Sequence, residues 1–213
     1  MPPPPEVIPR ASMLFFSLDV VSFLALLMLC YFLYRALLIS KIKLFAFFFF
    51  GFAALAAGEF AHILVLLTAF TTGASGLRIL FLTHAIGVIP QIAESIALLF
   101  IAAGYTLETR SKLLEVFVLL QFRRTWFSEF YLTSIINTAL LVYIVINSLS
   151  VYFASRKKQA SFPAIAFSLM LLSNALLIPS LLLADELLFL LSKLLHILGL
   201  LVLMLLAVEV SRA

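Results

Sequence analysis

Long apolar runs repeat along almost the whole chain, and they restrict its fold more than any other feature of the sequence. The runs cover residues 12–39, 44–70, 77–105, 131–153, 161–183 and 187–208. One helical crossing of a bilayer needs about 20 mostly apolar residues, so each run is long enough to span it. Backbone groups in lipid must be hydrogen-bonded within the segment, which selects helices for such runs. We therefore predict an all-α, polytopic transmembrane helix bundle with six spans.

The composition excludes a soluble protein of this length. Of the 213 residues, 65% are hydrophobic and only 11% are charged, and the mean hydropathy is +1.23. This leaves too few polar side chains to cover the surface of a soluble globule. We expect a single integral membrane domain over residues 1–213, in which residues 1–11 form a proline-rich, extended N-terminus.

The segment between the third and fourth runs has two interpretations. Its apolar part, residues 113–122, would extend only about 15 Å as a helix, which is half of the hydrocarbon thickness. We therefore predict that residues 106–129 form a short interfacial or half-inserted connector. If this segment also crosses, the chain has seven spans, and most Lys and Arg residues then lie on the side of the C-terminus, as the positive-inside rule requires. Length favours six spans and charge favours seven.

Ionisable and polar residues follow one face of the second and third runs. Glu59 and His62 are three residues apart and share a helix face. Gln91, Glu94 and Ser95 continue a polar stripe in the third run. Lipid exposure of a charge costs several kcal/mol, so this polar seam should face the bundle interior, with Glu59 and Glu94 protonated or paired.

Two other charged residues lie nearer to the ends of their runs. Asp19 is the only acid of the first run and stands about two turns from its start, and Lys193 stands near the start of the last run. We interpret Asp19 as a side chain that reaches the membrane interface, and we assign Lys193 no partner.

Small residues in the second run predict a close helix contact. They recur at intervals of three and four residues, at Gly51, Ala54, Gly58 and Ala61. Small side chains allow two helix backbones to approach each other in a membrane. We therefore expect these four residues to form the closest helix contact of the bundle.

The three histidines suggest a cofactor site. His62 and His84 lie at nearly equal distances from the short turn at residues 71–76, so their depths should agree to about 3 Å. Two imidazoles at one depth could bind haem b or a transition metal, with His196 of the last run as an optional third metal ligand. No cofactor follows from the sequence with certainty.

A weak internal repeat divides the runs into two groups of three. The segment FAALAAGE at residues 52–59 aligns with FSLMLLSN at residues 167–174, and Glu94 with its apolar tail aligns with His196 and its tail. Such a pattern predicts two three-helix repeats.

No motif indicates a reaction, so we name no catalytic residue and expect a non-catalytic protein. The net charge of +4 comes from Lys and Arg at the ends of the runs, which are topology signals rather than a nucleic-acid surface.

The main interpretation is a structural or assembly subunit in the plasma membrane, with lipid, other membrane subunits or a second copy as partners. One alternative is a proton, ion or small-solute transporter or a sensor that uses Glu59, Glu94 and His62. The other is a haem- or metal-binding electron-transfer subunit that uses His62 and His84.

Overall fold

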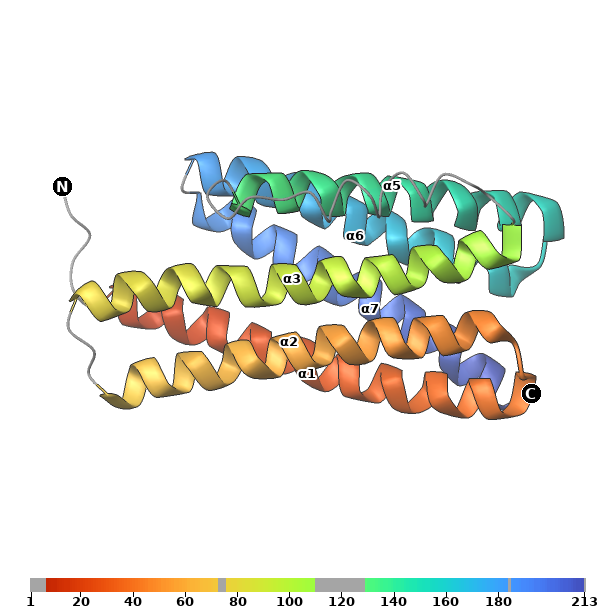
Figure 1. The fold of residues 1–213 in the computed structure, drawn as a ribbon, viewed down its shortest axis with the longest axis horizontal. Coiled ribbons are helices and arrows are strands. Elements are labelled where there is room, and N and C mark those ends of the chain that lie inside the picture. The colour runs from red at the N-terminus through yellow and green to blue at the C-terminus, as the bar shows by residue number, and fades with distance from the viewer. Residues whose placement is uncertain (1–6, 73–75, 110–128, 184, 213) are drawn as a thin grey trace.

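The computed structural model describes residues 7–72, 76–109, 129–183 and 185–212, and its elements over these ranges are all α-helices (Figure 1). They are α1 (Val7–Ser40), α2 (Lys43–Thr72), α3 (Gly76–Thr109), α5 (Glu129–Ser155), α6 (Lys158–Leu183) and α7 (Glu186–Arg212). All six are long and apolar enough to cross a membrane. The predicted all-α bundle with six apolar helices is confirmed.

Two predicted boundaries differ from the structure. The extended N-terminus was predicted to reach residue 11, but α1 already begins at Val7. Pro9 lies in the first turn of α1, where a missing backbone N–H costs no helical hydrogen bond. At the predicted connector, α3 continues to Thr109 and α5 begins at Glu129. The interior of that connector, residues 110–128, lies outside the described residues.

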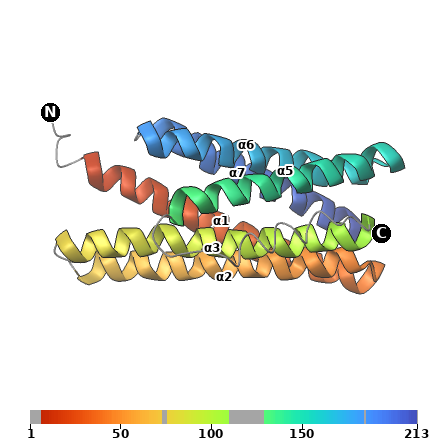
Figure 2. The same cartoon turned by 45° about the horizontal axis from the view of Figure 1, so that its top comes forward.

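The six helices pack as a closed ring in the order α1, α2, α3, α5, α6, α7 and back to α1. Figure 2 shows α2 and α3 side by side along one face of the bundle, and their contact is the most extensive one. The contact of α6 with α7 is nearly as extensive. The last helix therefore closes the bundle against the first.

Helices α3 and α5 run in the same direction. Ser95 of α3 contacts Asn137 of α5, and Thr106 further along α3 contacts Tyr143 further along α5. Thr109 and Ser155 therefore lie at the same end of the bundle, and the two chain termini lie at opposite ends (Figure 1). We call the end where α1 begins the N-terminal end and the other the C-terminal end. Termini on opposite sides are what seven crossings, the number that charge favours, would produce.

The first turn of each half has the same structure. Lys41 and Arg156 both have positive φ angles, 54° and 51°, and each donates its N–H to the carbonyl four residues earlier, at 2.9 and 2.8 Å. This is the left-handed cap that ends many helices. The preceding Ser40 and Ser155 each accept a hydrogen bond from the N–H two residues later, at 3.3 and 3.4 Å. The turn from α1 to α2 is thus repeated between α5 and α6.

The repeat extends into the helices. Phe52 and Phe167, which the internal sequence alignment pairs, have the same separation in the sequence as Ser40 and Ser155. Both phenylalanines are buried, with 1% and 0% of their surface exposed. Because α3 and α5 are parallel, the halves α1–α3 and α5–α7 run in the same directions, as expected for repeats related by an axis along the membrane normal. The structure thus agrees with the predicted repeat in the first two helices of each half, whereas the predicted alignment of Glu94 with His196 does not follow the same spacing.

Small residues bring neighbouring helices together in both halves. A Cβ added to Gly58 of α2 would overlap the Cβ of Ala93 of α3, and one added to Gly51 would lie 2.9 Å from the carbonyl oxygen of Ala97. In the other half, a Cβ on Gly199 would lie 3.0 Å from the carbonyl oxygen of Ala166. The predicted close contact is confirmed at Gly51 and Gly58, whereas Ala54 and Ala61 are only half-buried.

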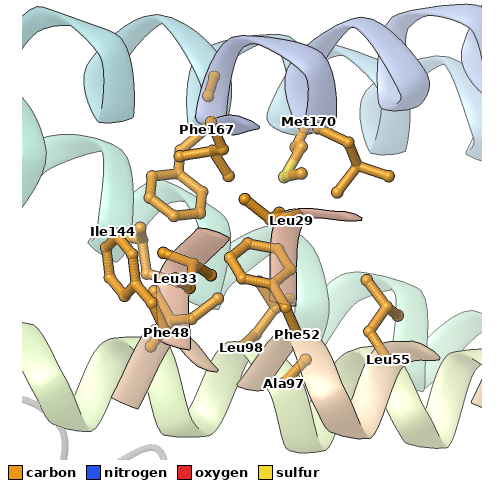
Figure 3. Packing of buried hydrophobic residues seen from close by; sticks show 14 of the residues in the cluster. Leu29, Leu33, Phe48, Phe52, Leu55, Ala97, Leu98, Ile144, Phe167 and Met170 are labelled. Atoms are coloured by element: carbon orange, nitrogen blue, oxygen red, sulfur yellow. The ribbon is translucent and has the colours of Figure 1, made fainter. Parts of the chain in front are cut away.

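The centre of the bundle is an apolar core that both halves share (Figure 3). The ring of Phe48 packs edge-on against Phe52 and Phe167, with centroid distances of 6.4 and 5.8 Å. Such aromatic pairs contribute about 0.5–1.5 kcal/mol each beyond their buried area. Since α2 and α6 both run from the C-terminal to the N-terminal end, the core lies on the C-terminal side of Glu59.

Candidate functional site

An ion pair joins the first and last helices inside the bundle. Lys193 of α7 donates a hydrogen bond from Nζ to Asp19 Oδ1 of α1 at 2.8 Å. Asp19 is only 4% exposed, so the interpretation that it reaches the membrane interface was wrong. The physical reason is that the ammonium group from α7 compensates the buried carboxylate.

The second oxygen of Asp19 faces two residues of α2. Asp19 Oδ2 lies 3.6 Å from His62 Nδ1, which lies 3.9 Å from Glu59 Oε2. One ligand-type atom from each of these three residues lies within 4.8 Å of the other two, and all three residues are buried. We call Asp19, Glu59, His62 and Lys193 the charged cluster.

Among the described residues, two atoms of the charged cluster find no hydrogen-bond partner. They are Glu59 Oε2 and His62 Nδ1, in residues that are 6% and 8% exposed. More than about 90% of buried polar groups in proteins have such a partner. The two atoms lie 3.9 Å apart, so a further atom placed between them would satisfy both.

A second group of polar residues joins α3 to α5. Asn137 donates a hydrogen bond from Nδ2 to Glu94 Oε2 at 3.1 Å, and its Oδ1 accepts one from Ser95 Oγ at 2.7 Å. Gln91 and Ser95 are buried, at 8% and 7% exposure, and Glu94 is half-buried. The structure thus brings the seam residues of α3 together and supplies Asn137 from α5 as their partner.

Neutral side chains complete the polar layer in the second half. Ser134 of α5 donates to Asn174 Oδ1 of α6 at 3.3 Å. Ser173 of α6 and Ser192 of α7 each donate to the carbonyl oxygen of the other, at 2.8 and 2.9 Å. Asn174 Nδ2 is a further buried atom without a partner.

The repeat relates these neutral residues to the charged cluster. The spacing that relates Ser40 to Ser155 also relates Asp19 to Ser134 and Glu59 to Asn174. Ser134 and Asn174 are hydrogen-bonded to each other, whereas Asp19 and Glu59 both face His62. Equivalent positions are therefore ionisable in the first half and neutral in the second.

The other predicted site residues have different outcomes. His84 belongs to α3, but its side chain lies outside the described part of the chain, so the predicted His62–His84 pair stays a prediction. His196 is half-buried on α7 and interacts electrostatically with Glu59 and Lys193.

Sequence reasoning missed the roles of Asp19, Lys193 and Asn137. One signal was available, because Asp19 is the only acid of the first apolar run and Lys193 is a basic residue inside the last one. A single acid and a single base in separate apolar runs are natural partners, since each needs the other in a membrane. A comparison of the chain with protein-family models, curated proteins and solved structures finds no match, so the geometry of the site alone supports a proposal for its function.

Proposed function

We propose that the protein is a membrane transporter of protons or small cations, and that the charged cluster is its ion-binding site. The observation that carries this proposal is the burial of Asp19, Glu59 and His62 beside the half-buried Lys193, while Glu59 Oε2 and His62 Nδ1 have no hydrogen-bond partner among the described residues. Ionisable residues inside membrane spans are rare, because they are costly, and they commonly line ion pathways or proton relays.

The charges favour this proposal over a purely structural subunit. Helices can be joined by neutral hydrogen bonds, as Ser173 and Ser192 join α6 to α7. A buried ion pair often stabilises a protein no better than well-packed apolar residues of similar volume. Neutral residues are therefore sufficient to hold helices together. The second half has them, as Ser134 and Asn174, at the positions where the first half carries the ionisable Asp19 and Glu59.

The location of the cluster also supports transport. Transporters built from repeats bind their substrate and coupling ions where the repeats meet. Lys193 belongs to the last helix of the second half and Asp19 to the first helix of the first half, so their ion pair lies at a contact between the halves. A motion of one half against the other would change this contact directly.

The surroundings of the cluster differ on its two sides. Toward the C-terminal end lies the apolar core with Phe48, Phe52 and Phe167, which would oppose the passage of an ion. Toward the N-terminal end, α7 extends from Lys193 back to Glu186, which is about 10 Å at 1.5 Å per residue. In our proposal this conformation is closed toward the C-terminal end, and the cluster exchanges its ion with the N-terminal side.

Reconstituted vesicles test the proposal. The protein is inserted into liposomes that contain a pH-sensitive dye, a pH gradient is imposed, and proton flux is recorded; Na⁺ and K⁺ flux are measured in parallel. We expect faster flux of at least one ion than in protein-free liposomes, and loss of the increase in Glu59→Gln. Asn174→Ala, at the equivalent position of the second half, is the matched control and should retain it. Flux equal to that of protein-free liposomes for all three ions would contradict the proposal.

A further inference from the structure

We infer that Asp19, Glu59 and His62 bind one divalent transition-metal ion of the Mn²⁺ or Zn²⁺ type between α1 and α2. This inference rests on the proposed function and names the ion for the same site. It starts from the convergence of Asp19, Glu59 and His62, which come from two helices and each place one ligand-type atom within 4.8 Å of those of the other two.

The spacing of these atoms is close to that of a coordination sphere. Bonds of a metal ion to nitrogen and oxygen are about 2.0–2.2 Å long, so two ligand atoms at a tetrahedral centre are about 3.4 Å apart. His62 Nδ1 lies 3.6 Å from Asp19 Oδ2 and 3.9 Å from Glu59 Oε2. Movements of a few tenths of an ångström in the side chains would bring both distances to the coordination value.

The two unpartnered atoms fit the role of metal ligands. A metal ion bonds to an unprotonated ring nitrogen and to a carboxylate oxygen, which His62 Nδ1 and Glu59 Oε2 can supply. One ion between them would satisfy both buried atoms at once. The equivalent residues of the second half, Ser134 and Asn174, are neutral and hydrogen-bond to each other directly, so they need no ion between them.

Lys193 holds the third ligand in place. Its Nζ binds Asp19 Oδ1, which leaves Oδ2 directed toward His62. Groups that bind the second atom of a metal ligand fix its orientation and commonly change metal affinity 10- to 100-fold when removed. Lys193 is thus a positioning residue for Asp19 and not a ligand.

The charges around the site favour a bound cation. Glu94 interacts electrostatically with Lys193 and Glu59, so three carboxylates and one ammonium group share this region. Asp19 and Glu59 together carry a charge of −2 when ionised, and the ammonium group of Lys193 offsets one of these charges, so a region of low dielectric constant favours a further cation at the two carboxylates.

The donor set indicates which divalent ions bind. One imidazole and two carboxylates suit Mn²⁺, Fe²⁺ or Zn²⁺, whereas Cu⁺ prefers sulfur ligands. Mg²⁺ dehydrates reluctantly and is rarely held by such a cage of protein atoms. Three protein ligands leave at least one position open, which lets a transported ion enter and leave.

Equilibrium binding to the full-length protein in detergent tests the inference. The protein is first freed of metal with a chelator, then titrated with Mn²⁺ by electron paramagnetic resonance and with Zn²⁺ by calorimetry, in excess Mg²⁺. We expect one ion per chain, and binding at least about 100-fold weaker in Asp19→Asn, Glu59→Gln and His62→Gln. Ser134→Ala and Asn174→Ala should bind as the wild type does.

Circular dichroism shows whether each variant is folded, and the rise in Tm on addition of Mn²⁺ gives a second readout that should vanish in Glu59→Gln. The inference is wrong if the wild type binds neither ion saturably, or if the three ligand variants bind as tightly as the controls. Proton flux that depends on Glu59 without metal binding would overturn the metal site and leave the proposed transport intact. Metal binding by the three ligands without flux of any ion would support the site and contradict transport.

Discussion

Lys193 Nζ and Asp19 Oδ1 form a hydrogen-bonded ion pair at 2.8 Å that closes the ring of helices between the last helix and the first. The two residues are 174 positions apart, and they belong to different repeats. A pair in this position can serve both stability and function, because it joins the two halves and holds Asp19 at the charged cluster.

We predict that Lys193→Met destabilises the protein by about 3–5 kcal/mol, since removal of one partner leaves the other as an uncompensated buried charge. The double variant Asp19→Asn with Lys193→Met should recover most of this loss. Unfolding in mixed micelles with increasing denaturing detergent measures the free energies. If the double variant is less stable than Lys193→Met, the two residues are not coupled.

The contact between Gly58 and Ala93 gives a second prediction. A Cβ at Gly58 would overlap the Cβ of Ala93, so Gly58→Ala should destabilise the protein by about 1–3 kcal/mol through overpacking. Combining it with Ala93→Gly should restore part of the stability, because the methyl group then has room. The neighbouring Ala57 is exposed, and Ala57→Leu is the control that should leave the Tm unchanged. An unchanged Tm in Gly58→Ala would contradict the close packing of α2 on α3.

The sequence was sufficient to predict features that depend on neighbouring residues. Long apolar runs became helices because their backbone hydrogen bonds are local, and Glu59 and His62 share a face because they are three residues apart. The spacing of small residues likewise predicted the contact at Gly51 and Gly58.

Features that depend on how the six helices pack into a closed ring could not be predicted from neighbouring residues. Asp19 near a helix end could either reach the interface or face inward, and only the position of α7 decides between them. The partner of Glu94 is Asn137 of α5, and that contact requires α5 to run parallel to α3. No local sequence pattern determines the direction of α5 relative to α3, because length favours six crossings and charge favours seven.

Asn137 is predicted to be the most important neutral residue of the polar layer. It bonds to both Glu94 and Ser95. In Asn137→Ala, Glu94 Oε2 loses this donor, at a cost of about 1–3 kcal/mol, whereas Ser95 Oγ keeps its bond to the carbonyl oxygen of Gln91 at 2.9 Å. Ser150→Ala is the matched control in the same helix, because Ser150 is exposed and bonds only to the carbonyl of Ile146 among its recorded contacts. Thermal unfolding in detergent should separate the two variants clearly; equal Tm values would show that the α3–α5 network adds no stability.

The direction of the helices predicts the membrane topology. Lys and Arg gather near the C-terminal end of the described helices, at Arg35, Lys41, Lys43, Arg156, Lys157 and Lys158. The positive-inside rule therefore places that end in the cytoplasm.

Single cysteines in a Cys30→Ser background test this topology with a membrane-impermeant thiol reagent. Thr109→Cys and Ser155→Cys should be protected in intact cells and react after permeabilisation. Leu183→Cys, at the N-terminal end of the bundle, should react in intact cells. Reaction of Thr109→Cys and Ser155→Cys from opposite sides would contradict the parallel arrangement of α3 and α5.

Ion movement should depend on the charged positions Asp19 and Glu59 of the first half and not on the neutral equivalents Ser134 and Asn174 of the second. Ion flux into reconstituted vesicles, compared within the pairs Asp19→Asn with Ser134→Ala and Glu59→Gln with Asn174→Ala, tests it most directly. The ion flux should fall about tenfold or more in both first-half variants, which is equivalent to about 1.4 kcal/mol or more. In both second-half variants it should fall by less than about twofold. Equal flux within each pair, or a larger loss in the second-half variants, would contradict it.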